Sequence, residues 1–310
     1  MIRSLAGVFA ALTTPFEKGR ISTEKLHQNI RKYNATRMEG YVVGGTTGEA
    51  AALSDEELET LVRAAREAAA QGKILIAGTG RESTAWTVEL TDRMAEAGAE
   101  AALVRTPARM PTRALEKHYL VLADSTRCPI ILYHIPQVTG VDLDPDLVVR
   151  LAGHPNIVGI KDSSGDLEFL GAVLPRLKKD FSYLVGSGSL FLFALMLGAS
   201  GGILRLADVA PRLCAALFEL FRKGKSDQAL RLQKRLIPLN EAIIHRFGVP
   251  GTKYALDCLG YYGGPPRPPL LPLTAAEKRV MKRLLISIGM LRQARVLKKE
   301  ERSGTKRRDS

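Results

Sequence analysis

Residues 156–166 read NIVGIKDSSGD, and this stretch places a lysine where the local pattern favours an apolar side chain. Residues 157–160 are apolar or small, which predicts a short buried strand, and the residues after Lys161 are turn formers. An ammonium group at the end of a buried strand is costly unless it is paired, deprotonated or used in chemistry. The stretch therefore predicts a buried strand that ends in a lysine with a functional role.

Further runs of apolar, β-favouring residues occur along the chain. Together with residues 157–164 they give eight candidate strands. Most are continuously apolar rather than alternating, as expected for parallel strands that are buried on both faces. The other candidates lie at residues 8–16, 40–45, 73–80, 101–107, 129–136, 183–188 and 201–206.

Helical patterns separate these runs. The clearest begins after Ser54, which forms a capping box with Glu57 ahead of an apolar stripe at helical spacing. Regular alternation of strands and helices over this length predicts a (β/α)₈ TIM barrel, whose usual size is about 250 residues. A doubly wound open sheet is the alternative, because alternation alone does not establish closure. The other predicted helices lie at residues 22–35, 83–97, 112–125, 144–152, 167–178, 190–197 and 211–223.

The strand signal ends after Lys225. Residues 228–247 and 251–260 read as helices, and a further helix is expected after the capping box of Thr274 and Glu277. We therefore expect a barrel over residues 1–224 and a C-terminal helical domain over residues 225–291. The basic remainder, residues 292–310, is expected to be a disordered tail.

The composition narrows the class of protein. The net charge of +13 is spread along the helices and the tail, without a basic patch interleaved with aromatic residues, so we expect no nucleic-acid partner. No apolar run reaches the roughly 18 residues of a membrane-spanning helix, and we expect no membrane partner. The N-terminus lacks a signal-peptide pattern and the three cysteines are scattered. The sequence therefore predicts a cytoplasmic protein with reduced thiols and no metal site.

Candidate catalytic residues come from the predicted strand ends, because barrel enzymes place their chemistry there. These ends hold Lys161, Tyr133, several hydroxyls and a single histidine, His134, but no plausible carboxylate pair and no cysteine. Metal-assisted hydrolysis and Ser/His/Asp chemistry are therefore disfavoured. A buried lysine can instead become an amine nucleophile that forms an imine with a carbonyl substrate, and Tyr133 is a candidate proton relay.

An anion site is expected at residues 44–50, which read GGTTGEA. Thr46, Thr47 and Gly48 offer hydroxyls and backbone N–H groups at a strand-to-helix turn, which suits a substrate carboxylate. Each candidate also has an ordinary structural role: Lys161 can face solvent, Tyr133 can be a core aromatic, and the turn can serve only as a helix cap. The combination favours chemistry over these separate roles.

With these residues in place, the sequence resembles the dihydrodipicolinate synthase and N-acetylneuraminate lyase family of class I, pyruvate-dependent aldolases. The resemblance covers about residues 6–291 and implies a (β/α)₈ barrel with a C-terminal helical domain, assembled as a homotetramer. The stretches that carry it are GGTTGEAAALS (44–54), IAGTG (76–80), ILYHIPQVTGVDL (131–143), NIVGIKDSSGD (156–166) and VGSGS (185–189).

The resemblance also implies a role for each matching residue. Lys161 is the expected Schiff-base lysine that attacks C2 of pyruvate or another 2-oxo acid, and Tyr133 is the expected proton relay, with Thr46 beside it. Thr47 and Gly48 are expected to hold the substrate carboxylate. Gly186 and Ile203 are expected to line the pocket near the imine. No cofactor and no metal are implied.

Two departures from the family bear on the substrate. Dihydrodipicolinate synthases place an arginine after the tyrosine block to bind the semialdehyde carboxylate, and here that position is Val138. They also carry a Tyr-Tyr pair after the fourth strand, where this chain has Ala108 and Arg109 in what reads as a shortened loop. Whether Arg105 or Arg109 replaces the missing groups is left open by the sequence.

The C-terminal stretch HRFGVPGTKYALDCLGYYGGPPRPPL (245–270) resembles most closely the 4-hydroxy-2-oxoglutarate aldolases of the family. The leading expectation is therefore a lyase that cleaves 4-hydroxy-2-oxoglutarate to pyruvate and glyoxylate, with a 2-oxo acid and an aldehyde as partners. One alternative is 4-hydroxy-tetrahydrodipicolinate synthesis, or another aldolase or dehydratase reaction of the family. An alternative of another class is a non-catalytic binding or regulatory protein on an aldolase scaffold.

Overall fold

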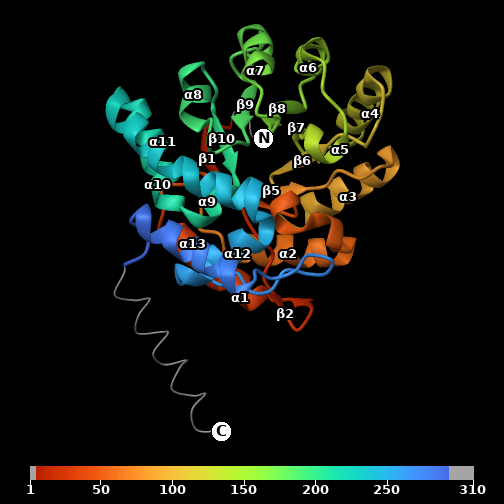
Figure 1. Cartoon of the computed structure of the whole chain (residues 1–310). Helices are drawn as coiled ribbons and strands as arrows, with labels where there is room; N and C mark the ends of the chain where they lie inside the picture. Colours follow the sequence, from red (N-terminus) through yellow and green to blue (C-terminus); the bar gives the residue numbers. More distant parts are fainter. Residues whose placement is uncertain (1–4, 293–310) are drawn as a thin grey trace, which may run out of the picture.

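The computed structural model describes residues 5–292, and its eight parallel strands close into a barrel surrounded by helices (Figure 1). Strand β1 pairs with both β4 and β10, so the sheet closes on itself. All eight predicted runs form barrel strands, and closure excludes the doubly wound open sheet. The strands are β1 (Gly7–Ala11), β4 (Gly40–Val43), β5 (Ile74–Gly78), β6 (Ala101–Arg105), β7 (Ile130–His134), β8 (Ile157–Asp162), β9 (Ser182–Val185) and β10 (Gly201–Leu204).

The predicted outer helices form around the barrel. The capping box before α2 is present, because the Ser54 hydroxyl accepts from the Glu57 N–H and the Glu57 carboxylate accepts from the Ser54 N–H. The outer helices are α1 (Thr23–Asn34), α2 (Asp55–Ala68), α3 (Thr84–Glu96), α4 (Thr112–Ser125), α6 (Pro145–Leu151), α7 (Leu167–Val173), α8 (Phe191–Met196) and α10 (Pro211–Arg222). Their apolar faces pack against the outer side chains of the strands in one continuous core.

Several short elements differ from the sequence expectation. The helix expected over residues 167–178 ends at Val173 and continues as the 3₁₀ turn η3 (Leu174–Arg176), because Pro175 cannot donate the next backbone hydrogen bond. Other elements are too short to show a hydrophobic period: the hairpin β2 (Phe16–Glu17) and β3 (Arg20–Ile21), the turns η1 (Thr46–Gly48) and η2 (Ala50–Ala52), and the helices α5 (Pro136–Thr139) and α9 (Arg205–Val209).

A register shift between β7 and β8 decides where Lys161 points. Ile130 pairs with Ile157, but Ile131 pairs with Gly159, so Val158 is an extra residue in β8. A bulge of this kind reverses the faces of all residues that follow it. Lys161 therefore points into the barrel and pairs with Tyr133, while Asp162 points outward.

The C-terminal helices α11 (Ser226–Glu241), α12 (Gly248–Cys258) and α13 (Ala275–Ser287) pack against one another beside the barrel (Figure 1). The helix expected over residues 228–247 is an α-helix that ends in the π-helical turn η4 (Ala242–Arg246). Because this region shares its core with the barrel helices, the domain boundary at residue 225 stays a prediction. The predicted tail lies outside the described residues apart from residue 292.

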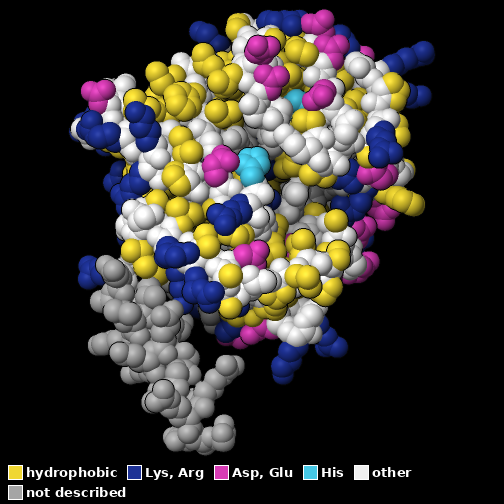
Figure 2. Space-filling view, viewed as in Figure 1, with side chains coloured by type: hydrophobic (Ala, Val, Ile, Leu, Met, Phe, Trp, Pro, Cys, Tyr) yellow, Lys and Arg dark blue, Asp and Glu magenta, His cyan; other side chains and the backbone are white. Residues whose placement is uncertain are grey.

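The surface agrees with a charge that is spread rather than concentrated. Basic side chains are distributed over the visible face and lie among acidic and apolar ones (Figure 2).

Among residues 5–292, no helix combines the length and the apolarity that crossing a membrane requires.

A buried carboxylate on α9 joins the last strand to the first. Asp208 Oδ2 accepts from the Thr13 N–H at 3.0 Å, and Oδ1 accepts from the Tyr33 hydroxyl at 2.6 Å. Burial raises the pKa of Asp208 to about 6, although the hydrogen bonds from Tyr33 and Thr13 oppose the increase. Folding therefore favours the protonated carboxyl.

This carboxyl makes the stability of the fold depend on pH. A raised pKa contributes stability below the unfolded value of 3.8, and this contribution is lost as the pH rises through about 6. We expect the free energy of unfolding to fall by about 3 kcal/mol from this group between pH 3 and 7. Asp208→Asn is expected to remove that decline, measured by urea unfolding across this pH range. Asp180→Asn, a substitution at an exposed position, is the control and should show the same decline in the free energy of unfolding as the unaltered protein. A decline that persists in Asp208→Asn contradicts the prediction.

Candidate active site

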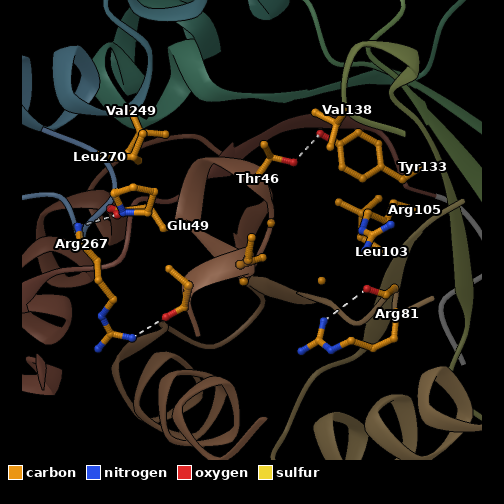
Figure 3. A pocket seen from close by; sticks show the side chains of 18 residues that line it. Thr46, Glu49, Arg81, Leu103, Arg105, Tyr133, Val138, Val249, Arg267 and Leu270 are labelled. Carbon is orange, nitrogen blue, oxygen red and sulfur yellow. Dashed lines mark hydrogen bonds between the residues drawn. The ribbon is translucent and has the colours of Figure 1, made fainter. Parts of the chain in front are cut away.

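A cavity of about 430 Å³ opens at the C-terminal ends of strands β4 to β7. One wall comes from the barrel, with Thr46, Leu103 and Tyr133 among its residues. The opposite wall comes from the C-terminal region and includes Val249 and Leu270 (Figure 3). This is the end at which barrel enzymes carry their active sites. The cavity is therefore the candidate active site.

Lys161 and Tyr133 lie together at this end of the barrel. The Lys161 amine lies 4.1 Å from the centre of the Tyr133 ring, and both side chains are 5% exposed. Thr46 Oγ1 lies 3.4 Å from the Tyr133 hydroxyl, and Figure 3 shows these two side chains facing each other. The structure thus brings together the three residues predicted to be catalytic.

The surroundings of Tyr133 change the pKa of its hydroxyl. Burial alone would raise the pKa of Tyr133, but the neighbouring Lys161 charge and hydrogen bonding with Thr46, Lys161 and Ser163 outweigh it. The pKa of Tyr133 is therefore below its ordinary value. A phenol of this kind gives up its proton more readily, which suits a proton relay.

Side chains on the outer face of β7, β8 and β9 hold the strand that carries Lys161 in place. His134 Nδ1 lies 3.0 Å from Asp162 Oδ1, and the Tyr183 hydroxyl donates to Asp162 Oδ2 at 2.7 Å. Burial would raise the pKa of Asp162, but contacts with His134, Ser164 and Tyr183 hold it below the usual value. A charged carboxylate thus links β7, β8 and β9 next to Lys161. His134 takes part in this support and does not belong to the cavity wall.

The turn after β4 is held by a buried ion pair that sequence reasoning missed. Glu49 adopts a left-handed conformation with φ of 61°, and its carboxylate lies 2.7 Å from the Lys253 amine. Both side chains are almost fully buried, and Lys253 also donates to the Thr14 and Pro265 carbonyls. The Arg267 N–H donates to the second Glu49 oxygen. These partners lie more than 200 residues away from Glu49, so no local pattern identifies them.

The other predicted binding residues lie around the lysine and the turn. Thr47 is buried, and its hydroxyl accepts from the Arg205 side chain at 3.2 Å. The Gly48 N–H already donates to Gly45, so within the turn it is engaged in structure. Ile203 is buried among the inward side chains with Tyr133. Gly186 follows β9, and a Cβ there would lie 2.9 Å from Ser163 Cβ and 3.1 Å from the Asp162 carbonyl oxygen, so a larger residue would force the segment at the end of β8 to shift.

The structure distinguishes the two arginines that the sequence left open. Arg105 lines the cavity, and its guanidinium pairs with Glu82 at 2.7 Å. Arg109 is exposed and is absent from the cavity wall. Val138 does line the cavity and is 55% exposed, so an apolar side chain occupies the position at which dihydrodipicolinate synthases carry an arginine. Within residues 5–292, no group of three or more His, Cys, Asp or Glu residues could hold a metal ion.

Comparisons with known proteins agree with this geometry. The model of the dihydrodipicolinate synthetase family matches residues 4–288. A 4-hydroxy-tetrahydrodipicolinate synthase from Exiguobacterium is 36% identical over 89% of this chain and 95% of its own length. The enzyme of that name from Xanthomonas axonopodis is 39% identical, covering 91% of this chain and 94% of its own. The pyruvate complex of dihydrodipicolinate synthase from Acinetobacter baumannii superimposes with a TM-score of 0.89, at 31% identity over 93% of this chain and all of that one.

These names correct one expectation. The predicted family is confirmed, but the expected closeness to the 4-hydroxy-2-oxoglutarate aldolases is not supported, because the relatives carry the name of the alternative. The C-terminal stretch behind that expectation also packs against the barrel. Besides Lys253 and Arg267, its Tyr262 hydroxyl donates to the Phe16 carbonyl. Much of the stretch therefore serves packing, while Val249, Arg267, Pro269 and Leu270 within it also line the cavity.

The buried ion pair yields a stability prediction. Removing one partner leaves an uncompensated buried charge, so Lys253→Met should lower the free energy of unfolding by about 3–5 kcal/mol. Adding Glu49→Gln to that variant removes the orphaned charge and should recover part of the loss. Urea unfolding of the two variants measures both effects, with the exposed Lys117→Met as the matched control. A single variant as stable as this control would show that the pair is dispensable.

Proposed function

The chain belongs to the dihydrodipicolinate synthetase family, whose enzymes form a lysine Schiff base, and from this premise we propose that Lys161 forms an imine with pyruvate. The observation that carries the proposal is the buried Lys161 amine against Tyr133 at the end of the barrel that holds the cavity. Among residues 5–292 no carboxylate pairs with Lys161, and a buried charge is normally paired, so few other functions explain a lysine at this position.

The proposed reaction uses the neighbouring groups in order. The Lys161 amine attacks C2 of pyruvate, and loss of water leaves the imine. Tyr133 carries protons to and from the reacting oxygen, and its lowered pKa supports this role. Loss of a C3 proton gives an enamine, C3 of the enamine attacks the carbonyl carbon of an aldehyde, and hydrolysis frees the product and the lysine. The reverse sequence cleaves the same bond.

The pyruvate carboxylate is proposed to bind at η1. Thr46 and Thr47 begin this turn, so their N–H groups have no acceptor within it, while the Gly48 N–H is already bonded. The hydroxyls of both threonines add further donors. An anion at the start of this turn is therefore stabilised by two adjacent residues, one of which also contacts Tyr133.

For the aldehyde we propose aspartate 4-semialdehyde, which makes the reaction that of a 4-hydroxy-tetrahydrodipicolinate synthase. The names of the relatives support this choice. Arg81, Arg105 and Arg267 line the space that the aldehyde would enter, but each is already paired with a carboxylate of the chain, so the names of the relatives carry this choice.

A second candidate is cleavage of 4-hydroxy-2-oxoglutarate to pyruvate and glyoxylate. The observation in its favour is Val138, which places an apolar side chain in the cavity wall where the family's synthases carry an arginine. The Lys161 chemistry is shared by both candidates. They differ only in the carbonyl compound that meets the enamine.

The assembly and location of the enzyme are part of the same proposal. We infer a cytoplasmic homotetramer, as the family resemblance implies. Exposed apolar side chains on α3 and α4, among them Trp86 at 65% and Val121 at 41%, are consistent with contacts between subunits.

The imine is tested by trapping. Incubation with pyruvate and borohydride should add a reduced pyruvate adduct to the peptide that contains Lys161, detected by mass spectrometry. Lys161→Ala should give no adduct, because the remaining lysines lack this site. An adduct of equal yield in Lys161→Ala, or none in the unaltered enzyme, would refute the proposal. Lys117→Met, an exposed substitution, serves as the control.

Measurements of turnover test the Tyr133 proton relay and rank the two candidate reactions. Tyr133→Phe should retain some trapping but lose roughly 10²–10⁴-fold in turnover, because general acid–base catalysis is removed. Condensation of pyruvate with aspartate 4-semialdehyde is expected to exceed glyoxylate release from 4-hydroxy-2-oxoglutarate in kcat/KM. The opposite ranking would establish the second candidate instead.

A further inference from the structure

Arg205 stands out among the residues around the active site. It follows strand β10 as the first residue of α9, and its Nε donates to the Thr47 hydroxyl at 3.2 Å. Its Nη1 donates to the Ile243 carbonyl at 2.8 Å. Within residues 5–292, Nη2 has no hydrogen bond. Arg205 is partly buried, and burial lowers its pKa despite opposing effects of Tyr133 and Asp208.

The other arginines near the cavity are neutralised locally. Arg81 pairs with Asp55 at 2.7 Å, Arg105 pairs with Glu82, and Arg267 pairs with Glu57. Arg205 makes no ion pair with any residue in the described part of the chain. The charge of Asp208 acts on Arg205 only without direct pairing, and a partly buried cation without a directly paired carboxylate is stabilised by a ligand that supplies one.

The C-terminal region holds Arg205 in this position. The Ile243 carbonyl belongs to the π-helical turn η4, a type of irregularity that often occurs at functional sites. A π turn shifts the backbone hydrogen bonds by one residue, and here a carbonyl of that turn accepts from the guanidinium. Arg205 therefore connects the helical region to Thr47.

The contact with Thr47 has a defined direction. A guanidinium can only donate hydrogen bonds, so the Thr47 oxygen is the acceptor in this pair. The hydroxyl proton of Thr47 then points away from Arg205 and is available to another acceptor. A carboxylate is the acceptor that gains most, because the positive charge of Arg205 lies directly behind the hydroxyl.

We propose that Arg205 is a positioning residue for the 2-oxo acid, which orients the Thr47 hydroxyl and supplies the counter-charge for the substrate carboxylate. This inference rests on the proposed function. It assigns selection of an anionic carbonyl substrate to the Arg205–Thr47 pair, while Lys161 and Tyr133 carry out the chemistry. No role for Arg205 follows from the chemistry at Lys161 alone.

The test compares a charged and an uncharged carbonyl probe. Borohydride trapping at Lys161 is measured against the concentration of pyruvate and of methyl pyruvate, in which an ester replaces the carboxylate. In Arg205→Met, half-maximal trapping should require roughly 10- to 100-fold more pyruvate, with the maximal rate changed far less. The methyl pyruvate dependence should stay within about threefold, since that probe has no charge to stabilise.

Two further variants separate positioning from folding. Arg205→Lys keeps the charge with a single nitrogen and should recover part of the pyruvate affinity. Adding Thr47→Val to Arg205→Met should cost little beyond the larger single loss, because the two residues act as a unit. Arg63→Met, which removes an exposed arginine from α2, is the control and should match the unaltered enzyme. If Arg205→Met does not fold, Arg205→Lys and Thr47→Val apply the same comparison of probes.

The outcomes separate this inference from the proposed function. If the unaltered enzyme gives no adduct at Lys161, the proposed function fails. If it gives the adduct, but Arg205→Met weakens pyruvate and methyl pyruvate equally or leaves both unchanged, the inference about Arg205 is overturned and the proposed function stands.

Discussion

The register shift at Val158 is the constraint on which the active site depends. Without this extra residue, the faces of β8 would be reversed beyond it, and Lys161 would point toward the outer helices. With it, the amine enters the barrel beside Tyr133 and the Asp162 carboxylate points outward. One irregularity in pairing therefore places the reactive group and its support on opposite faces of the same strand. Bulges commonly re-aim side chains near active sites.

The support extends in two directions from this strand. On the outer side, Asp162 joins β7, β8 and β9 through His134 and Tyr183. These contacts hold the strand that carries Lys161 in place. On the opposite side of the cavity, the Glu49–Lys253 ion pair fixes the turn that carries the threonines. Both are buried charged groups, which are costly to desolvate but specify one arrangement when every partner is present. The site is thus held by the barrel and by the C-terminal region together.

The strands, the barrel and the residues Lys161, Tyr133 and Thr46 could be predicted because they follow from local patterns and from the rule that barrel chemistry lies at strand ends. The bulge at Val158 could not, since it is defined by pairing with a different strand. Lys253 and Arg205 were missed because their partners are distant in sequence. The substrate expectation rested on the C-terminal stretch, whose residues both pack against the barrel and line the cavity, so a resemblance over this stretch does not by itself identify the aldehyde.

The arrangement divides substrate recognition into two parts. In the proposed function the 2-oxo acid contacts Lys161, Tyr133 and the threonine turn, where Lys161, Tyr133 and Thr47 are buried and Thr46 is partly buried. The proposed aldehyde faces the wall that contains Val138 and Leu270, whose side chains are exposed. Val138 and Leu270 take part neither in the register of β8 nor in the buried ion pair, so we expect changes there to alter the partner without altering the imine. This separation explains how one lysine chemistry can serve different aldehydes on the same barrel.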